Sequence, residues 1–122
     1  MLTVSQPWLC NNLRGDHLSL RMLKNKVDYG WIHNYNIFYN DAVLHPQMGK
    51  WWVKVPAVRA MMMAHPKAEW IFWIDADAIF TDMDFKPPLE KYKDHNLVVD
   101  GWPFVITQEK SWVGLNAGVF LL

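Results

Sequence analysis

The sequence predicts an α/β fold with a mostly parallel sheet and flanking helices. Short strand-like segments alternate with helical ones along the 122 residues, which is the element order of a parallel α/β sheet. The apolar run at residues 70–74 shows no polar alternation, as expected for a strand covered on both faces. The length suits one domain that spans residues 1–122.

The first half is expected to contain a strand, a helix and a second strand. Residues 2–5 form a short first strand that Gln6 and Pro7 close, and residues 36–40 form the second strand. Residues 16–33 have helical spacing, and Asp16 suits the helix start because a carboxylate accepts from free backbone N–H groups. The apolar positions that would share one helix face are Leu20, Leu23, Val27 and Trp31.

The second half is expected to begin with another helix. Its body is residues 57–64, with Pro56 in the first turn. Pro66 ends it, because the residue before a proline avoids the helical conformation. After the strand at residues 70–74, the further candidates are strands at 97–99 and 118–122 and a short helical turn at 89–93.

Composition excludes several classes of protein. The 12 basic residues balance the 12 acidic ones, so the chain lacks the positive field that draws proteins to nucleic acid. The single cysteine, Cys10, cannot form an internal disulfide. No apolar run approaches the roughly 18 residues of a membrane span, and no signal peptide precedes the first strand. We expect no nucleic-acid partner and no membrane segment in this chain.

Asp75 and Asp77 directly follow the most strand-like run. Ligands of parallel sheets bind beyond the carboxyl ends of the strands, and residues two apart in an extended segment point to the same side. The two carboxylates would therefore converge, and a divalent cation such as Mg²⁺ or Mn²⁺ would offset their charge with help from substrate phosphates. From the residues alone, helix capping and salt bridging are the open alternative.

A second acidic pair, Asp82 and Asp84, has the same spacing. Chance alone supplies about one such pair in a chain of this composition. This pair lies in a segment that leads to two prolines, which predicts turn or helix-cap chemistry. Context therefore favours Asp75 and Asp77 as the metal-binding pair.

Five segments in order along nearly the whole chain carry a further signal. They are residues 15–29, the Trp-x-Lys-x-Pro segment 52–56, the acidic segment 69–83, and residues 101–103 and 111–118. Together they resemble the plant galactosyl- and xylosyltransferases of glycosyltransferase family 34. The resemblance implies a partial GT-A fold, a Rossmann-like domain that binds nucleotide sugars. Residues 1–122 would be the N-terminal, donor-binding part of a longer catalytic domain.

The resemblance also implies an activity and a set of binding residues. The expected reaction transfers galactose or xylose from UDP-galactose or UDP-xylose to a cell-wall polysaccharide acceptor, with Mn²⁺ (or Mg²⁺) and retention of configuration. Family members are Golgi membrane proteins, which implies a lumenal Golgi location. The implied positions are Asp75 and Asp77 at the metal, Asp75, Ala76 and Asp77 at the diphosphate, Ser5, Gln6, Asp28 and Tyr29 near the uridine, Lys54 near the donor, and Asn116 at the sugar or acceptor. No residue is assigned as a catalytic base.

Two alternatives stay open. Because the family's sequence continues beyond residue 122, the isolated chain is expected not to turn over. A non-catalytic carbohydrate- or nucleotide-binding fragment of the same fold is therefore the first alternative. A metal-dependent phosphohydrolase is the second, and it would need further carboxylates or histidines at other strand ends. The five histidines show no ligand spacing.

Overall fold

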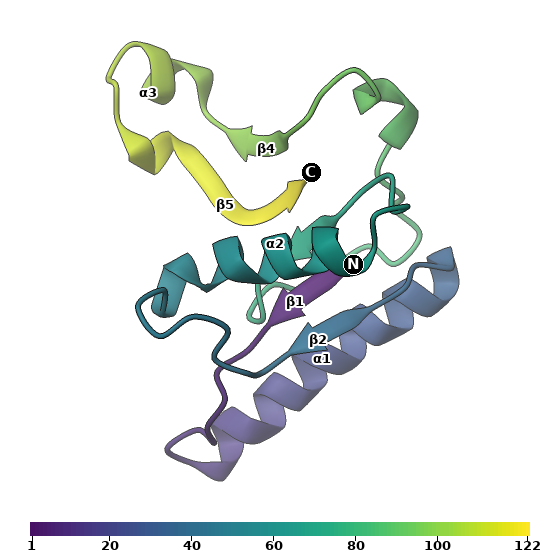
Figure 1. Ribbon diagram of the computed structural model, residues 1–122, viewed down its shortest axis with the longest axis vertical. Helices are drawn as coiled ribbons and strands as arrows, with labels where there is room; N and C mark the ends of the chain where they lie inside the picture. Colours follow the sequence, from purple (N-terminus) through teal and green to yellow (C-terminus); the bar gives the residue numbers. More distant parts are fainter.

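A computed structural model describes all 122 residues as one five-stranded sheet with helices packed on it (Figure 1). The strands are β1 (Leu2–Val4), β2 (Phe38–Asn40), β3 (Phe72–Ile74), β4 (Val98–Gly101) and β5 (Leu115–Leu121). The α-helices are α1 (Leu13–His33), α2 (Lys54–Ala64) and α3 (Pro103–Thr107). Three 3₁₀ helices, η1 (Lys50–Val53), η2 (Leu89–Tyr92) and η3 (Trp112–Gly114), lie in the connections. None of the helices combines the length and apolar composition that crossing a bilayer requires.

The strand order is β2-β1-β3-β5-β4, and the sheet is mixed. β1 pairs in parallel with both β2 and β3, which confirms the predicted βαβ core. The crossovers from β1 to β2 and from β2 to β3 run in opposite directions, so right-handed connections place α1 and α2 on opposite faces. β5 runs antiparallel to β3 and β4. β4 and β5 form an antiparallel pair joined by a long connection that contains α3 and η3. At the base of this connection Trp102 N donates to Gly114 O at 2.8 Å.

α1 begins before its expected start, at Leu13. The cap is Asn12, whose side-chain Oδ1 accepts from Gly15 N at 2.8 Å. Asp16 instead lies in the first turn and accepts from Cys10 N at 2.8 Å, which ties the preceding loop to the helix. Asp16 thus lies at the helix start as expected, and the capping residue is Asn12, one turn earlier.

The apolar face predicted for α1 is not the face that the fold buries. Leu20 and Trp31 are exposed, and the buried residues of the helix are Lys26, Tyr29 and Gly30. At Gly30 a Cβ atom would lie 2.4 Å from the Ile37 side chain, so a larger residue there would require Ile37 to move. The polar face of α1 thus points inward, toward the loop that follows β3.

The apolar core lies between β1, β3 and α2. Its six buried residues are Leu2, Val4, Ala57, Val58, Ile71 and Trp73. Trp73 is the largest of them at 1% exposure, and its ring stacks on Phe120 of β5 with an angle of 7° between the planes. This core fixes β1 beside β3, so the carboxyl ends of the two parallel strands meet at one edge of the sheet.

Candidate functional site

The carboxyl ends of β1 and β3 open onto a cleft of about 340 Å³. Six of the residues singled out in the sequence line it: Ser5, Gln6, Lys54, Asp75, Ala76 and Asp77. Ser5 and Gln6 directly follow β1, the aspartates directly follow β3, and Lys54 opens α2. The fold therefore brings together three segments that are far apart in the sequence.

Asp75 is the most constrained of these residues. Its Oδ1 accepts from Trp73 Nε1 at 2.7 Å and from Lys54 Nζ at 2.9 Å, and its Oδ2 accepts from Lys54 Nζ at 3.0 Å. Its backbone N donates to Gly118 O of β5 at 2.8 Å. Trp73 and Asp75 are two residues apart, so the indole N–H and the carboxylate lie on the same side of the extended chain. The carboxylate is thus held in one orientation toward the cleft.

Lys54 brings a positive charge to the same point. Its ammonium group also donates to Ala117 O at 2.6 Å, and it lies 5.6 Å from the centre of the Trp73 ring. An ammonium group has three donors, and the contacts to the two Asp75 oxygens and to Ala117 O use all three. The side chain is only 17% exposed, so its charge acts in a partly desolvated site.

Asp77 completes the acidic pair and is free to bind. It is exposed, and its side chain forms no ion pair or hydrogen bond within the chain. Ala78 N donates to Asp75 O at 3.1 Å, which closes a tight turn across the pair. Asp75 Oδ2 accepts only from Lys54 and keeps a further acceptor position, and both residues line the same cleft.

These two carboxylates fit a hard divalent cation. Mg²⁺ is commonly bound by one or two carboxylates, with substrate phosphates and water supplying the other oxygens. No cluster of three or more His, Cys, Asp or Glu side chains is assembled in the structure. A cation here would therefore depend on its ligand as well as on the protein, as in sites that bind a metal–diphosphate complex.

Asn116 lies next to the site and is hydrogen-bonded to Gly118. Its side-chain Oδ1 accepts from Gly118 N at 2.9 Å. A Cβ atom on Gly118 would lie 3.0 Å from Asn116 Oδ1 and 3.3 Å from Asp75 Oδ2, so the glycine lies between the two side chains. Asn116 is exposed on β5 and lies outside the residues that line the cleft itself.

The structure does not bring Asp28 and Tyr29 to the cleft. Both lie inside α1, which continues to His33, and the helix start rather than its end lies beside the carboxyl end of β1. Asp28 pairs with Lys24 one turn away at 2.5 Å. Tyr29 is fully buried, so its side chain cannot touch a nucleotide. The structure therefore does not place these two residues at the cleft, and their contact with uridine stays a prediction.

Comparison with known families gives a match along the whole chain. The sequence profile of the galactosyl transferase GMA12/MNN10 family matches residues 1–122. The chain belongs to this family. The resemblance to glycosyltransferase family 34 is thereby confirmed.

Relatives of this GMA12/MNN10-family chain are close in sequence and longer. Glycosyltransferase 6 of Arabidopsis thaliana is 60% identical over 122 residues, which are 100% of this chain and 28% of the relative. Galactomannan galactosyltransferase 1 of Cyamopsis tetragonoloba is 59% identical, again over 100% of this chain and 28% of the relative. The chain thus spans just over a quarter of the length of these curated relatives.

A solved structure confirms the fold. It is the crystal structure of a glycosyltransferase involved in the glycosylation of the major capsid of PBCV-1, with a TM-score of 0.62. The match covers 99% of this chain and 58% of that chain at 18% sequence identity. At that identity the likeness concerns the fold alone, and it confirms the predicted partial GT-A fold.

Lys26 is a residue near the site that the sequence did not predict. It is 1% exposed, and its ammonium group donates to Ala76 O at 2.8 Å and to Ala78 O at 2.5 Å. Burial lowers the pKa of Lys26, while the negative charges of Asp77 and Asp75 act in the opposite direction. A helical spacing of polar residues at 26, 29 and 33 was the available signal, and the apolar pattern of the opposite face obscured it.

Tyr29 supports the same loop farther along. Its ring stacks on Phe80 with centroids 3.4 Å apart, and its hydroxyl donates to Phe85 O at 2.7 Å. Burial, with smaller contributions from Tyr35 and Asp82, raises the pKa of Tyr29 to about 12. The hydroxyl therefore keeps its proton, and with it this hydrogen bond, throughout the neutral range.

The second acidic pair has the structural role that its context predicts. Asp82 Oδ1 accepts from Asp84 N at 3.0 Å and from Phe85 N at 3.3 Å, which makes a local turn. Neither Asp82 nor Asp84 lines the cleft. This pair is therefore a natural control for Asp75 and Asp77.

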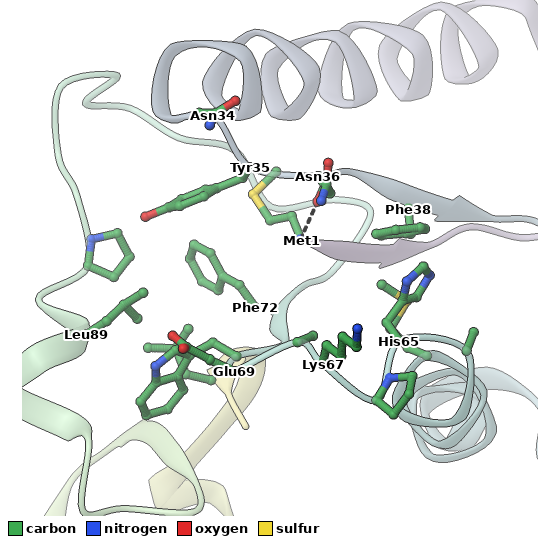
Figure 2. A pocket seen from close by; sticks show the side chains of 17 residues that line it. Met1, Asn34, Tyr35, Asn36, Phe38, His65, Lys67, Glu69, Phe72 and Leu89 are labelled. Atoms are coloured by element: carbon green, nitrogen blue, oxygen red, sulfur yellow. Dashed lines mark hydrogen bonds between the residues drawn. The ribbon is translucent and has the colours of Figure 1, made fainter.

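The largest cavity lies at the amino ends of β1, β2 and β3, opposite to the cleft (Figure 2). It has a volume of about 780 Å³ and includes Met1 at the start of β1, Asn36 before β2, and Glu69 before β3. The terminal amine of Met1 donates to Asn36 O at 2.6 Å along its wall. None of the acidic, basic or amide residues of the cleft lines this cavity. Size alone would therefore favour the end of the sheet opposite to the cleft.

Proposed function

We propose that this chain binds the diphosphate of a UDP-sugar through a divalent cation held by Asp75 and Asp77, as the donor-binding part of a glycosyltransferase. The observation that carries the proposal is the convergence of Asp75, Asp77 and Lys54 in one cleft at the carboxyl ends of β1 and β3. Family membership and the shared fold support the same reading.

Each residue of the cleft has a separate part in this proposal. Mn²⁺ or Mg²⁺, when bound, would supply positive charge that stabilises the leaving diphosphate. Asp75 and Asp77 hold the cation, and Trp73 fixes the orientation of Asp75. Lys54 adds a localised positive charge beside the same phosphates. Ser5 and Gln6, at the end of β1, are placed to contact the nucleoside.

The sugar and the acceptor are finer parts of the proposal. The relative named galactomannan galactosyltransferase 1 favours UDP-galactose over UDP-xylose as donor, and a polysaccharide as acceptor. Asn116, across Gly118 from Asp75, is placed to face the transferred sugar or the acceptor. Retention of configuration and a lumenal Golgi location follow from family resemblance and stay predictions.

The test is calorimetric titration of the 122-residue chain with UDP in Mn²⁺ and in EDTA. We expect UDP to bind in Mn²⁺ with an affinity about tenfold or more above that in EDTA, which is at least about 1.4 kcal/mol. Uridine, which lacks the diphosphate, is expected to show no such dependence on Mn²⁺. Equal affinities for UDP with and without Mn²⁺, by a chain shown to be folded, would contradict the proposal.

The same titration separates the alternatives. Metal-dependent binding of UDP without transfer of sugar to a polysaccharide identifies a nucleotide-binding fragment of the fold. Hydrolysis of UDP in the presence of Mn²⁺ would instead support a phosphohydrolase. We expect binding without hydrolysis, because no second group of acidic or histidine ligands is assembled in the structure.

A further inference from the structure

The loop after β3 takes its shape from α1 and not from backbone pairing. Within residues 76–85 one backbone hydrogen bond is made, from Ala78 N to Asp75 O, and it lies at the start of the loop. Asp82 adds a local turn, because its Oδ1 accepts from Asp84 N and Phe85 N. The other loop contacts come from side chains of α1. They are those of Asn25 with Phe80 N and O, Lys26 with Ala76 O and Ala78 O, Tyr29 with Phe85 O, and His33 with Met83 O.

Lys26 is the member of this group that contacts the acidic turn itself. Ala76 lies between Asp75 and Asp77, and Ala78 follows Asp77, so the two carbonyls flank the Asp77 side chain in the sequence. The third ammonium donor goes to Met22 O at 3.3 Å, within α1. All three donors of the ammonium group are thus used, and its buried position leaves it one orientation.

We propose that Lys26 is the positioning residue of the metal-binding turn: it holds the carbonyls of Ala76 and Ala78 from behind, so that the carboxylates of Asp75 and Asp77 face the cleft together. This inference rests on the function proposed above. It assigns to the polar face of α1 a role in binding, through a lysine that does not itself line the cleft.

If the side chain at position 26 only filled space between α1 and the loop, a lysine would not be required. Burying an ammonium group without a carboxylate in direct contact is costly, and an apolar residue of similar length would fill the space at lower cost. The positive charge has a function in this place because two negative side chains must be held near one another. Lys26 lies behind that pair and lowers their mutual repulsion, while its hydrogen bonds set the carbonyl directions of the turn.

The test compares Lys26→Met with Lys24→Met, a change of the same type on the same helix. Lys24 is exposed and pairs only with Asp28, so its variant should match the parent chain. For Lys26→Met we expect the dissociation constant of UDP in Mn²⁺ to rise by about 10- to 100-fold, as for other outer-shell residues of metal sites. Lys26→Arg, which restores a cation with donors, is expected to recover part of that affinity.

Two further measurements separate positioning from general loss of stability. Val58→Ala, a core change in α2, should lower the stability and leave the UDP affinity of the folded chain within about twofold. Amide hydrogen exchange at Ala78 and Phe80 should speed up by about tenfold in Lys26→Met and stay unchanged in Val58→Ala after correction for global unfolding. Unchanged exchange and unchanged UDP affinity in Lys26→Met would overturn the inference.

Hydrogen exchange keeps this test independent of the function proposed for the site. If the parent chain binds no UDP in Mn²⁺, the proposed function fails, and the exchange rates at Ala78 and Phe80 still decide whether Lys26 fixes the turn. Faster exchange confined to the turn supports the positioning role. Exchange that is as slow as in the parent chain rejects it.

Discussion

Asp77→Asn is expected to remove the Mn²⁺-dependent part of UDP binding and to leave the fold intact. The side chain is exposed and has no partner in the chain, so its change should alter the free energy of unfolding by no more than about 0.5 kcal/mol. Half of the protein's carboxylate ligands for the cation would be lost at the same time. We expect the UDP affinity in Mn²⁺ to fall by about tenfold or more, to that of the parent chain in EDTA.

Asp75→Asn is the informative partner of this variant. It should lose the same metal-dependent affinity, and it should also destabilise the fold by about 1–3 kcal/mol, because Lys54 loses its charged partner in a partly buried site. Asp82→Asn with Asp84→Asn is the matched control, since that pair has the same spacing and a purely local role. The metal assignment fails if Asp77→Asn binds UDP in Mn²⁺ as well as the control does.

Trp73→Ala is expected to have the largest effect on stability. Trp73 is the largest buried side chain, in a cluster of only six buried apolar residues. Removal of a buried tryptophan costs about 3–5 kcal/mol, which is a large part of the stability of a domain of this size. Urea unfolding followed by far-ultraviolet circular dichroism should show a much lower midpoint. Trp112→Ala, at a residue that is 84% exposed, should stay within about 0.5 kcal/mol of the parent chain.

Trp73→Phe separates packing from hydrogen bonding at the same position. The phenyl ring retains much of the packing on Phe120, but the N–H donor to Asp75 Oδ1 is lost. We expect a folded chain whose UDP affinity in Mn²⁺ falls by about tenfold, as for an outer-shell partner of a metal ligand. A Trp73→Phe chain that unfolds like the parent and binds UDP equally well would show that the indole N–H has no part in the site.

The positions of the strands along the chain were predictable because the relevant signals are local. The unbroken apolar run at residues 70–74 predicted the central strand, and the acidic pair directly after it predicted where the site would lie. The antiparallel pairing of β5 was not predictable in the same way. It depends on contacts between β5 and strands distant in the sequence, which no local pattern records.

The errors on α1 share one physical cause. Apolar periodicity predicts which helix face is buried only when the buried contacts are apolar, and this helix buries Lys26 and Tyr29 against the carbonyls of a loop. The same effect hid the contribution of Lys26. The expected contact of Asp28 with the nucleotide had another origin, the family resemblance, and Asp28 does not line the cleft. Asn116 lies across Gly118 from Asp75 but outside the residues that line the cleft, and its contact with the sugar or acceptor stays a prediction.

The most direct test of the central claim is to locate the cation. A ¹⁵N-labelled chain would be titrated with Mn²⁺ in the presence of UDP, with Mg²⁺ as the diamagnetic reference, and the broadening of each backbone amide signal measured. The proposed site predicts selective broadening at Gln6, Ala76, Asp77 and Gly118, with Asn36 and Glu69 in the large cavity unaffected. Broadening centred on Asn36 and Glu69, or spread evenly over the chain, would contradict a metal–diphosphate site at Asp75 and Asp77.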